Sequence, residues 1–154
     1  MVSLTIKKRA VTRSEEDYLK AIWTLSERSA EQQTAGTKDL AEVLTVSQPA
    51  ISKMLKQMER RHLVAHVPYH GVRLTSQGRA IALKIVRRHR LLELFLAQIL
   101  NYQLDLVHDE AERLEHHISD EFENKIDVLL GFPQTCPHGS PIPNRAGEFE
   151  ASPK

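Results

Sequence analysis

The segment VSQPAISKMLKQMERRHLVAHVPYHGVRLT, residues 46–75, decides the fold because it joins a helix to a β-hairpin. Ser47 is suited to cap a helix, and the proline two residues later suits the first helical turn. Apolar residues then recur at helical spacing. Segments 63–67 and 72–75 read as strands and flank a turn that contains proline and glycine. The segment therefore predicts one helix followed by an antiparallel hairpin.

Helical patterns on both sides of this segment complete the predicted architecture. Upstream, residues 14–29 predict a helix, and Thr37 is expected to cap a short second helix. Two short helices joined by a tight turn and followed by a hairpin form a winged helix-turn-helix. Downstream, apolar periodicity predicts helices at 76–100, 105–118 and 120–131. The expected fold class is therefore mainly α, with an N-terminal winged helix-turn-helix followed by an all-α domain.

The predicted domains follow from these elements. We expect a winged helix-turn-helix domain at 1–75, beginning with a loose basic arm over residues 1–12. A helical domain should occupy 76–131. The remaining residues, 132–154, hold five prolines and predict an extended, mobile tail.

Composition limits the function classes. The 154 residues are 41% apolar, which is ample for a core, and a net charge of +1 means that any basic surface is local. The single cysteine, Cys136, precludes an intrachain disulfide and suits a reducing cytosol. The N-terminus lacks the apolar core of a signal peptide, and no apolar run is long enough to span a membrane. We expect a cytoplasmic protein without a membrane partner.

The exposed side of the third helix predicts a surface that reads DNA. In a winged helix-turn-helix this helix enters the major groove. Its polar side chains can bond bases or phosphates, and Pro49 and Ala50 can contact thymine methyl groups. The alternative is a helix-turn-helix that packs against protein, with its lysines only solvated. The predicted DNA-binding residues are Thr37, Ser47, Gln48, Pro49, Ala50, Ser52, Lys53 and Lys56, with Tyr69 and Arg73 from the hairpin.

A second segment, VHDEAERLEHHISDE at 107–121, concentrates side chains that bind metals. On a helical wheel four of them share one side, beside an apolar side. Carboxylates and imidazoles together suit Mn²⁺ or Fe²⁺. The alternative is a solvated or salt-bridged face that neighbouring arginines neutralise. The candidate ligands are His108, Glu112, Glu115 and His116 here, His89 and Glu93 on the preceding helix, and Asp17 on the first helix.

Four segments, SEEDYLKAIW, VSQPAISKMLKQMERRHLV, LTSQGRAIALKIVRRHRLLELFL and VHDEAERLEHHISDE, together resemble the diphtheria toxin repressor family of metal-dependent transcriptional regulators. The resemblance runs from about Ser14 to Pro143. It implies a homodimer that binds a palindromic double-stranded DNA operator when loaded with divalent metal, and that represses metal-uptake genes. The segment CPHGSPIP resembles the one that leads into an SH3-like domain in longer members, and this chain ends at Lys154, too soon for such a domain.

The resemblance also assigns the candidate ligands to two sites. The family's primary site matches Asp17, Glu112, Glu115 and His116, and the ancillary site of its iron-responsive branch matches His89, Glu93 and His108. Iron-responsive members have Met and Cys where this chain has Asp17 and Glu112, whereas those two acids match the manganese transport regulator branch. That branch has a bridging Glu at the position of Lys20, so its closely spaced pair of metals is in doubt here. We expect Mn²⁺ as the cofactor, with Fe²⁺ as the alternative and Zn²⁺ binding in vitro.

Two rival classes and the oligomeric state complete the expectations. A di-iron enzyme would need paired Glu-x-x-His motifs on separate helices, and the chain has one such motif, at 59–62. A zinc hydrolase would need His-Glu-x-x-His, which is absent from the sequence. We expect no catalysis and no small organic substrate. A homodimer should form through helices 76–100 and 105–118, with Leu91, Leu94, Phe95 and Leu96 at the interface.

Overall fold

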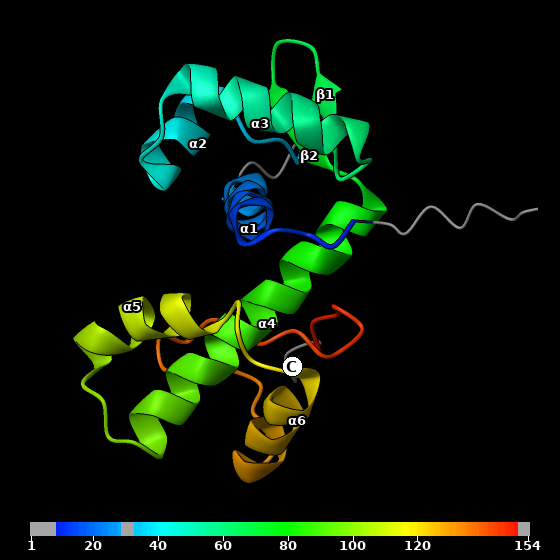
Figure 1. Cartoon of the computed structure of the whole chain (residues 1–154). Helices are drawn as coiled ribbons and strands as arrows, with labels where there is room; N and C mark the ends of the chain where they lie inside the picture. Colours follow the sequence, from blue (N-terminus) through cyan, green and yellow to red (C-terminus); the bar gives the residue numbers. More distant parts are fainter. Residues whose placement is uncertain (1–8, 29–32, 151–154) are drawn as a thin grey trace, which may run out of the picture.

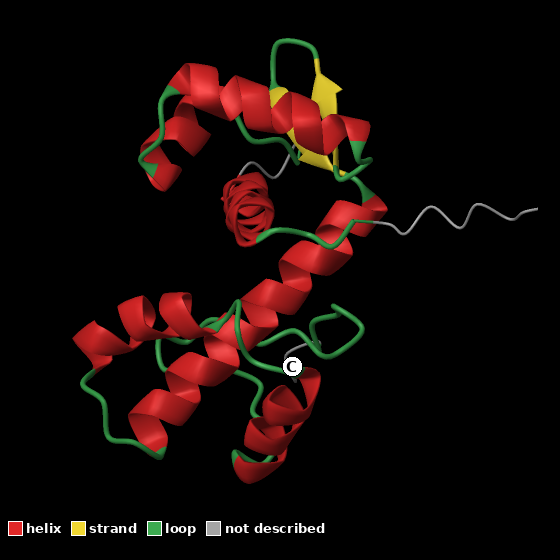
Figure 2. Cartoon of the chain, viewed as in Figure 1, coloured by secondary structure: helices red, strands yellow, loops and turns green. Residues whose placement is uncertain are grey.

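The computed structural model describes residues 9–28 and 33–150, which form two lobes joined by one long helix (Figure 1). The predicted mainly helical fold is confirmed, and the only sheet within the described residues is a two-stranded hairpin (Figure 2). In chain order the elements are α1 (Arg13–Arg28), α2 (Thr37–Leu44), α3 (Gln48–Arg60), β1 (Val64–Val67), β2 (Gly71–Leu74), α4 (Ser76–Gln98), α5 (Leu104–Leu114) and α6 (Asp120–Leu129).

The N-terminal lobe is the predicted winged helix-turn-helix. Helices α2 and α3 pack over α1, and β1 pairs antiparallel with β2 in the register Val64 to Leu74. The Ser47 hydroxyl caps α3 by accepting from the backbone N–H of Ala50, as predicted. Helix α1 begins at Arg13, one residue before the predicted range of 14–29, because Thr12 caps it. Thr12 and Glu15 exchange side-chain and backbone hydrogen bonds of 3.0 and 3.1 Å, which form a capping box.

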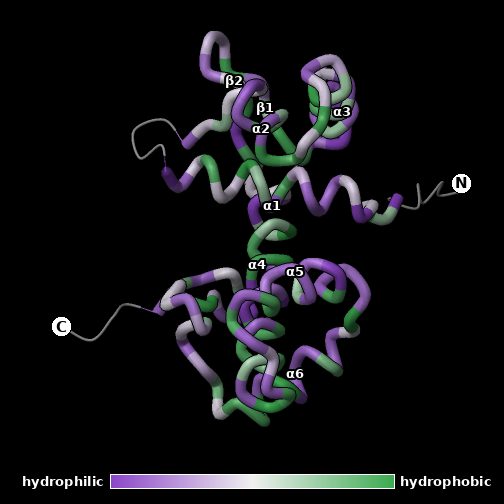
Figure 3. Tube along the Cα trace, turned by 90° about the vertical axis from the view of Figure 1, so that its left-hand side faces the viewer, coloured by the Kyte–Doolittle hydropathy of each residue, from purple (hydrophilic) through white to green (hydrophobic). Residues whose placement is uncertain are grey.

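Helix α4 runs through both lobes and contributes residues to both hydrophobic cores. Its first half contributes Leu83 and Val86 to the core of the N-terminal lobe, and its second half contributes Leu91 and Leu92 to the second core. Hydrophobic residues accordingly recur along this helix, with hydrophilic residues between them (Figure 3). Gly78 is required near its start, because a Cβ there would lie 2.0 Å from the carbonyl oxygen of Leu63.

Buried ion pairs fix α6 against α4. The guanidinium of Arg87 donates to Glu123 and to Asp127, both at 2.8 Å, and Arg88 donates to the other carboxylate oxygen of Glu123 at 2.8 Å. Arg88 also donates to Asp120 at the start of α6. Burial makes the charges of Arg87, Arg88 and Glu123 dependent on their partners, whereas Asp120 is exposed.

Helix α5 ends earlier than predicted. Its last residue is Leu114, and residues 115–117 form a turn instead of continuing the helix to 118. The next helix begins soon afterwards, where the Ser119 hydroxyl caps α6 by accepting from the N–H of Phe122. The Glu115 and His116 side chains therefore extend from the end of a helix rather than from its face.

The proline-rich segment folds against both lobes, so the prediction of an extended, mobile tail is wrong for its described part. Cys136 and Ile142 join the second core, and Phe149 stacks on Trp23 of α1 with ring centroids 6.0 Å apart. Much of the predicted basic arm, and residues 151–154, lie outside the described residues.

The prediction of which residues form a dimer interface is largely wrong. Leu91, Leu94 and Leu96 are buried within the chain's own second core, and Phe95 is partly buried against it. Apolar side chains are instead exposed after α4, on α5 and on α6. Those of the second lobe are Ile99, Leu100, Tyr102, Leu104, Leu106, Phe122, Val128, Leu129 and Phe132.

Candidate metal centres and DNA-reading surface

Three of the four residues predicted for the primary site meet between the lobes. One ligand atom each from Asp17 on α1, and from Glu115 and His116 after α5, lie within 4.8 Å of one another. His116 Nε2 is 2.8 Å from Asp17 Oδ1 and 3.5 Å from Glu115 Oε1. We call these three residues the primary cluster. It is the point where α1 of the N-terminal lobe faces the turn between α5 and α6.

Glu16 orients the imidazole of this cluster. Its carboxylate lies 2.8 Å from His116 Nδ1, so that Nε2 faces Asp17 and Glu115. A metal-bound histidine commonly donates its other ring N–H to a carboxylate, which fixes the ring and its tautomer. The sequence analysis missed this role, because Glu16 lies in the first turn of α1, where any acid favours the helix dipole.

Glu112, the fourth predicted ligand, lies apart from the primary cluster. Its side chain is 51% exposed, 3.5 Å from Lys20 Nζ and 3.2 Å from His108 Nε2. It borders a cleft of about 620 Å³ between α1, α2 and α5, which Asp17 also lines. Asp17 is thus reachable from solvent.

The three residues predicted for the ancillary site also come together. His89 Nε2 is 2.6 Å from Glu93 Oε1 and 3.1 Å from His108 Nδ1. The two imidazoles meet edge to face, with ring centroids 4.8 Å apart. We call these residues the ancillary cluster. His138 was not predicted as a ligand. Its Nδ1 lies 2.6 Å from Glu93 Oε2, but the angles do not suit a hydrogen bond.

Lys20 lies between the two clusters. Its ammonium donates to both carboxylate oxygens of Glu115, at 2.9 and 3.1 Å, and lies 3.2 Å from His89 Nδ1. His89 Nδ1 also contacts Glu115. Lys20 thus places a fixed positive charge at the position where the manganese branch has a bridging carboxylate.

The pKa values in this region reflect burial opposed by pairing. Burial alone would raise the pKa of Glu115, but the hydrogen bond with His89 and the charge of Lys20 lower it. Burial would lower the pKa of His89, but hydrogen bonds with Glu115 and Glu93 raise it. The pKa of Glu93 is lowered, because His89 outweighs its burial. The lowered pKa values favour the ionised carboxylates of Glu115 and Glu93, and the raised pKa of His89 favours its protonated imidazole, which must lose its proton before it can bind a metal.

The donor set fits a hard or borderline divalent cation. Both clusters offer only carboxylate oxygen and imidazole nitrogen, which Mn²⁺, Fe²⁺ and Zn²⁺ accept. The primary cluster includes His116, whose second nitrogen is already held by Glu16. This preorganisation is what a metal site requires.

The predicted DNA-reading residues form one exposed surface on the N-terminal lobe. Residues 47–50, Ser52, Lys53 and Lys56 are all exposed at the start and along the outer side of α3, whereas Ile51 is fully buried. Thr37 is half-buried at the start of α2. At the wing, Tyr69 is fully exposed with a positive φ of 66°, and Arg73 is exposed on β2.

Fold and site together define a class: a winged helix-turn-helix whose first helix shares a candidate metal site with a helical second domain. Comparison with known families agrees. Residues 10–72 match the family model of the iron dependent repressor N-terminal DNA binding domain, and residues 75–144 match that of the iron dependent repressor metal binding and dimerisation domain. The chain belongs to the iron-dependent repressor family, which includes the diphtheria toxin repressor. This is a family of transcriptional repressors and not of enzymes.

Two curated relatives are a diphtheria toxin repressor and a repressor named for iron. The chain is 38% identical over 131 residues to the diphtheria toxin repressor of Corynebacterium efficiens. The aligned residues are 85% of this chain and 56% of that protein. It is 36% identical over 128 residues to the iron-dependent repressor IdeR of Mycobacterium tuberculosis. The aligned residues are 83% of this chain and 54% of that protein. The chain thus spans about half the length of these relatives.

Solved structures of manganese regulators share the fold. A manganese-dependent transcriptional repressor in complex with manganese is 46% identical, with a TM-score of 0.79 over 90% of this chain and 63% of that one. The manganese regulator SloR is 41% identical, with a TM-score of 0.78 over 91% of this chain and 64% of that one.

No helix in residues 9–28 or 33–150 combines the length and apolarity that crossing a bilayer requires.

Proposed function

We propose that this protein is a metal-dependent repressor whose homodimer binds a palindromic operator when Mn²⁺ occupies the primary cluster, and that it controls metal-uptake genes. One observation carries the proposal: Asp17 of the DNA-binding lobe meets Glu115 and His116 of the second lobe. A group held by all three residues ties α1 to the turn before α6. Occupancy of the cluster thereby affects the position of the reading helix α3, which packs with α2 over α1.

Electrostatics supports a switch at this point. Asp17, Glu16 and Glu115 bring three carboxylates around His116, and Lys20 pairs with Glu115 alone among them. A bound divalent cation supplies the positive charge that offsets Asp17 and Glu115 together. Asp17 can act as a hinge because it is the ligand that lies on the DNA-binding lobe. Metal shifts the equilibrium only if the DNA-competent state binds it more tightly.

The donor chemistry favours Mn²⁺ over Fe²⁺. Asp17 supplies a hard oxygen where iron-responsive members have a methionine sulfur, and neither cluster includes a sulfur ligand. Glu112, a second acid of the manganese type, can join the primary cluster by turning its exposed side chain. Zn²⁺ binds such ligands tightly in vitro without being the cellular signal.

The dimer and the operator are proposed from surface and symmetry. The exposed apolar residues of the second lobe, from Ile99 to Phe132, offer a face that burial against a second copy would stabilise. A two-fold dimer presents two copies of α3 to successive major grooves, about 34–36 Å apart. The operator is then a palindrome.

Selection from random DNA duplexes tests the proposal without knowledge of the operator. Duplexes are selected on the protein with Mn²⁺ and with a chelator, and the enriched sequence is measured by fluorescence anisotropy. We expect a palindrome enriched with Mn²⁺ only. Lys53→Ala and Lys56→Ala should each weaken binding and lower the salt slope by about one. Lys125→Ala, on α6 and exposed, is the control. Enrichment that is independent of metal would refute the proposal.

Metal identity is tested by titrating operator affinity against Mn²⁺, Fe²⁺ and Zn²⁺ under anaerobic conditions. Mn²⁺ should activate at concentrations where Fe²⁺ does not. In Asp17→Met, which introduces the iron-type residue, the preference should shift toward Fe²⁺. An unchanged order of metals in Asp17→Met would show that Asp17 does not set the specificity.

A further inference from the structure

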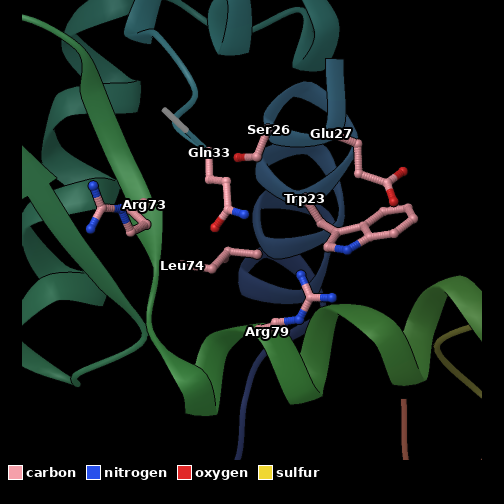
Figure 4. A pocket seen from close by; sticks show the side chains of 7 residues that line it. All are labelled: Trp23, Ser26, Glu27, Gln33, Arg73, Leu74 and Arg79. Carbon is pink, nitrogen blue, oxygen red and sulfur yellow. The ribbon is translucent and has the colours of Figure 1, made fainter. Parts of the chain in front are cut away.

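A cavity of about 250 Å³ lies apart from both metal clusters, between α1, β2 and the start of α4 (Figure 4). It belongs to the DNA-binding lobe, on the side of α1 that faces α4 and the wing. None of its lining residues is a candidate metal ligand. Its walls include Trp23, Ser26, Glu27, Gln33, Arg73 and Arg79.

Two buried hydrogen-bonding groups in its wall have no protein partner among the described residues. The indole Nε1–H of Trp23 belongs to a side chain that is 2% exposed, and the Ser26 hydroxyl oxygen is buried as well. Buried donors without an acceptor are rare and costly, so each requires an explanation. In Figure 4 the indole nitrogen faces Arg79, and the Ser26 hydroxyl points toward the Gln33 amide.

The cavity is also locally cationic. The guanidinium of Arg79 lies beside the indole nitrogen in Figure 4, and forms no ion pair with a described carboxylate. The nearby acid, Glu27, points to the opposite side of the indole. Burial raises the pKa of Glu27, and the charges of Arg90, whose guanidinium lies 5.4 Å from the centroid of the Trp23 ring, and of Arg79 oppose that rise. The two donors and the Arg79 guanidinium therefore share one side of the cavity in Figure 4, and Glu27 lies on the other.

We propose that this cavity binds a small oxyanion, a carboxylate or phosphate of metabolite size, which accepts hydrogen bonds from Trp23, Ser26 and Arg79. An oxyanion satisfies the two orphaned donors and pairs with the guanidinium in a single site. A volume of about 250 Å³ is below the range of drug-sized pockets, which excludes a large ligand.

Such a ligand joins α1 to α4. Helix α1 also carries Asp17, six residues before Trp23 and on the same rigid element. The site therefore gives the DNA-binding lobe a second ligand, and the residues that bind it are not metal ligands. This inference does not require the proposed metal response.

The one tryptophan of the chain, Trp23, reports on the cavity directly. The metal-free full-length protein is titrated with sodium phosphate and with sodium citrate, and its tryptophan emission is compared with that in sodium chloride at matched ionic strength. We expect a saturable change with at least one oxyanion. A change that chloride reproduces, or that does not saturate, overturns the proposal.

Variants locate the site. Arg79→Gln should weaken oxyanion binding at least tenfold, and Ser26→Ala about threefold or more, since charge-assisted bonds are the stronger ones. Arg28→Gln, an exposed arginine on α1 outside the cavity wall, should remain within twofold of the parent. Circular dichroism confirms folding, and Ser26→Ala alone suffices if Arg79→Gln is unstable. Equal effects of Arg28→Gln and Arg79→Gln would overturn the proposal.

The same chemistry could come from a DNA phosphate, because the wing lies nearby. A non-specific duplex is therefore added to the oxyanion-bound protein. The small-molecule site predicts that the duplex leaves oxyanion affinity unchanged, and that Arg79→Gln leaves the salt slope of DNA binding unchanged. Competitive displacement, together with a slope reduced by about one, would reassign Arg79 to the DNA backbone and refute the proposal.

Discussion

Replacing Asp17 with alanine separates metal binding from metal response. Asp17 Oδ1 lies 2.8 Å from His116 Nε2, and Asp17 is the member of the primary cluster that α1 contributes. Glu115 and His116 remain after the substitution, and Glu16 still orients the imidazole. We therefore expect Asp17→Ala to bind metal in a weaker shell that no longer holds α1.

The two losses differ in size. Loss of an outer-shell partner of a ligand typically costs about 10–100-fold in metal affinity, so loss of the ligand Asp17 itself should cost about 100-fold. Coupling between two sites is typically about 1–3 kcal/mol, or about 5–150-fold in operator affinity. Raising the Mn²⁺ concentration about 100-fold restores occupancy but not the coupling. At saturating metal, Asp17→Ala should therefore bind the operator no better than the metal-free parent does.

Parallel titrations measure both quantities. Mn²⁺ affinity is taken from the electron paramagnetic resonance of free Mn²⁺, and operator affinity from fluorescence anisotropy at saturating metal. Asp109→Ala, an exposed acid on α5, is the matched control and should retain both affinities. Full metal activation of operator binding in Asp17→Ala would show that Asp17 only favours the helix dipole and that the switch lies elsewhere.

Three further predictions concern Lys20, the ion pairs between α4 and α6, and the ancillary cluster. Lys20→Met should lower the metal-free free energy of unfolding by about 2–3 kcal/mol, because Glu115 loses its buried cation, and Mn²⁺ should recover part of this loss in urea denaturation. An unchanged urea midpoint would contradict this role of Lys20. Glu123→Ala should cost about 3 kcal/mol or more, since it leaves two buried arginines underpaired, whereas the exposed Glu121→Ala should stay within about 0.5 kcal/mol. His108→Ala should weaken metal binding at the ancillary cluster in calorimetry but retain Mn²⁺-activated operator binding, and loss of activation would place the switch there.

Local chemistry in the sequence explains which elements were predicted. The cap at Ser47 and the apolar spacing after it act within one or two helical turns, so α3 and the hairpin were predicted within a residue or two. The end of α5 was not, because the apolar spacing continues to Ile118 although the helix ends at Leu114, before the turn that leads to α6. The tail was misjudged because its prolines are local, whereas the packing of Phe149 on Trp23 is not.

The site shows the same limit. Asp17, Glu115 and His116 were identified from residue type and resemblance, and the structure brings them together. The partners that orient or neutralise ligands were missed, because their contacts join distant parts of the chain. Glu16 meets His116 across 100 positions, and Lys20 Nζ reaches Glu115 across 95. An acid or a lysine in a helix is otherwise indistinguishable from a solvated charge.

The most direct test of the metal switch is its reciprocity. If metal raises operator affinity by a given factor, the operator must raise metal affinity by the same factor. Mn²⁺ affinity is therefore measured by electron paramagnetic resonance with and without the selected operator duplex, with a scrambled duplex as control. We expect operator binding to tighten Mn²⁺ binding about 5–150-fold, by the factor found for the reverse effect. Equal Mn²⁺ affinity with operator, scrambled duplex and no DNA would contradict the account.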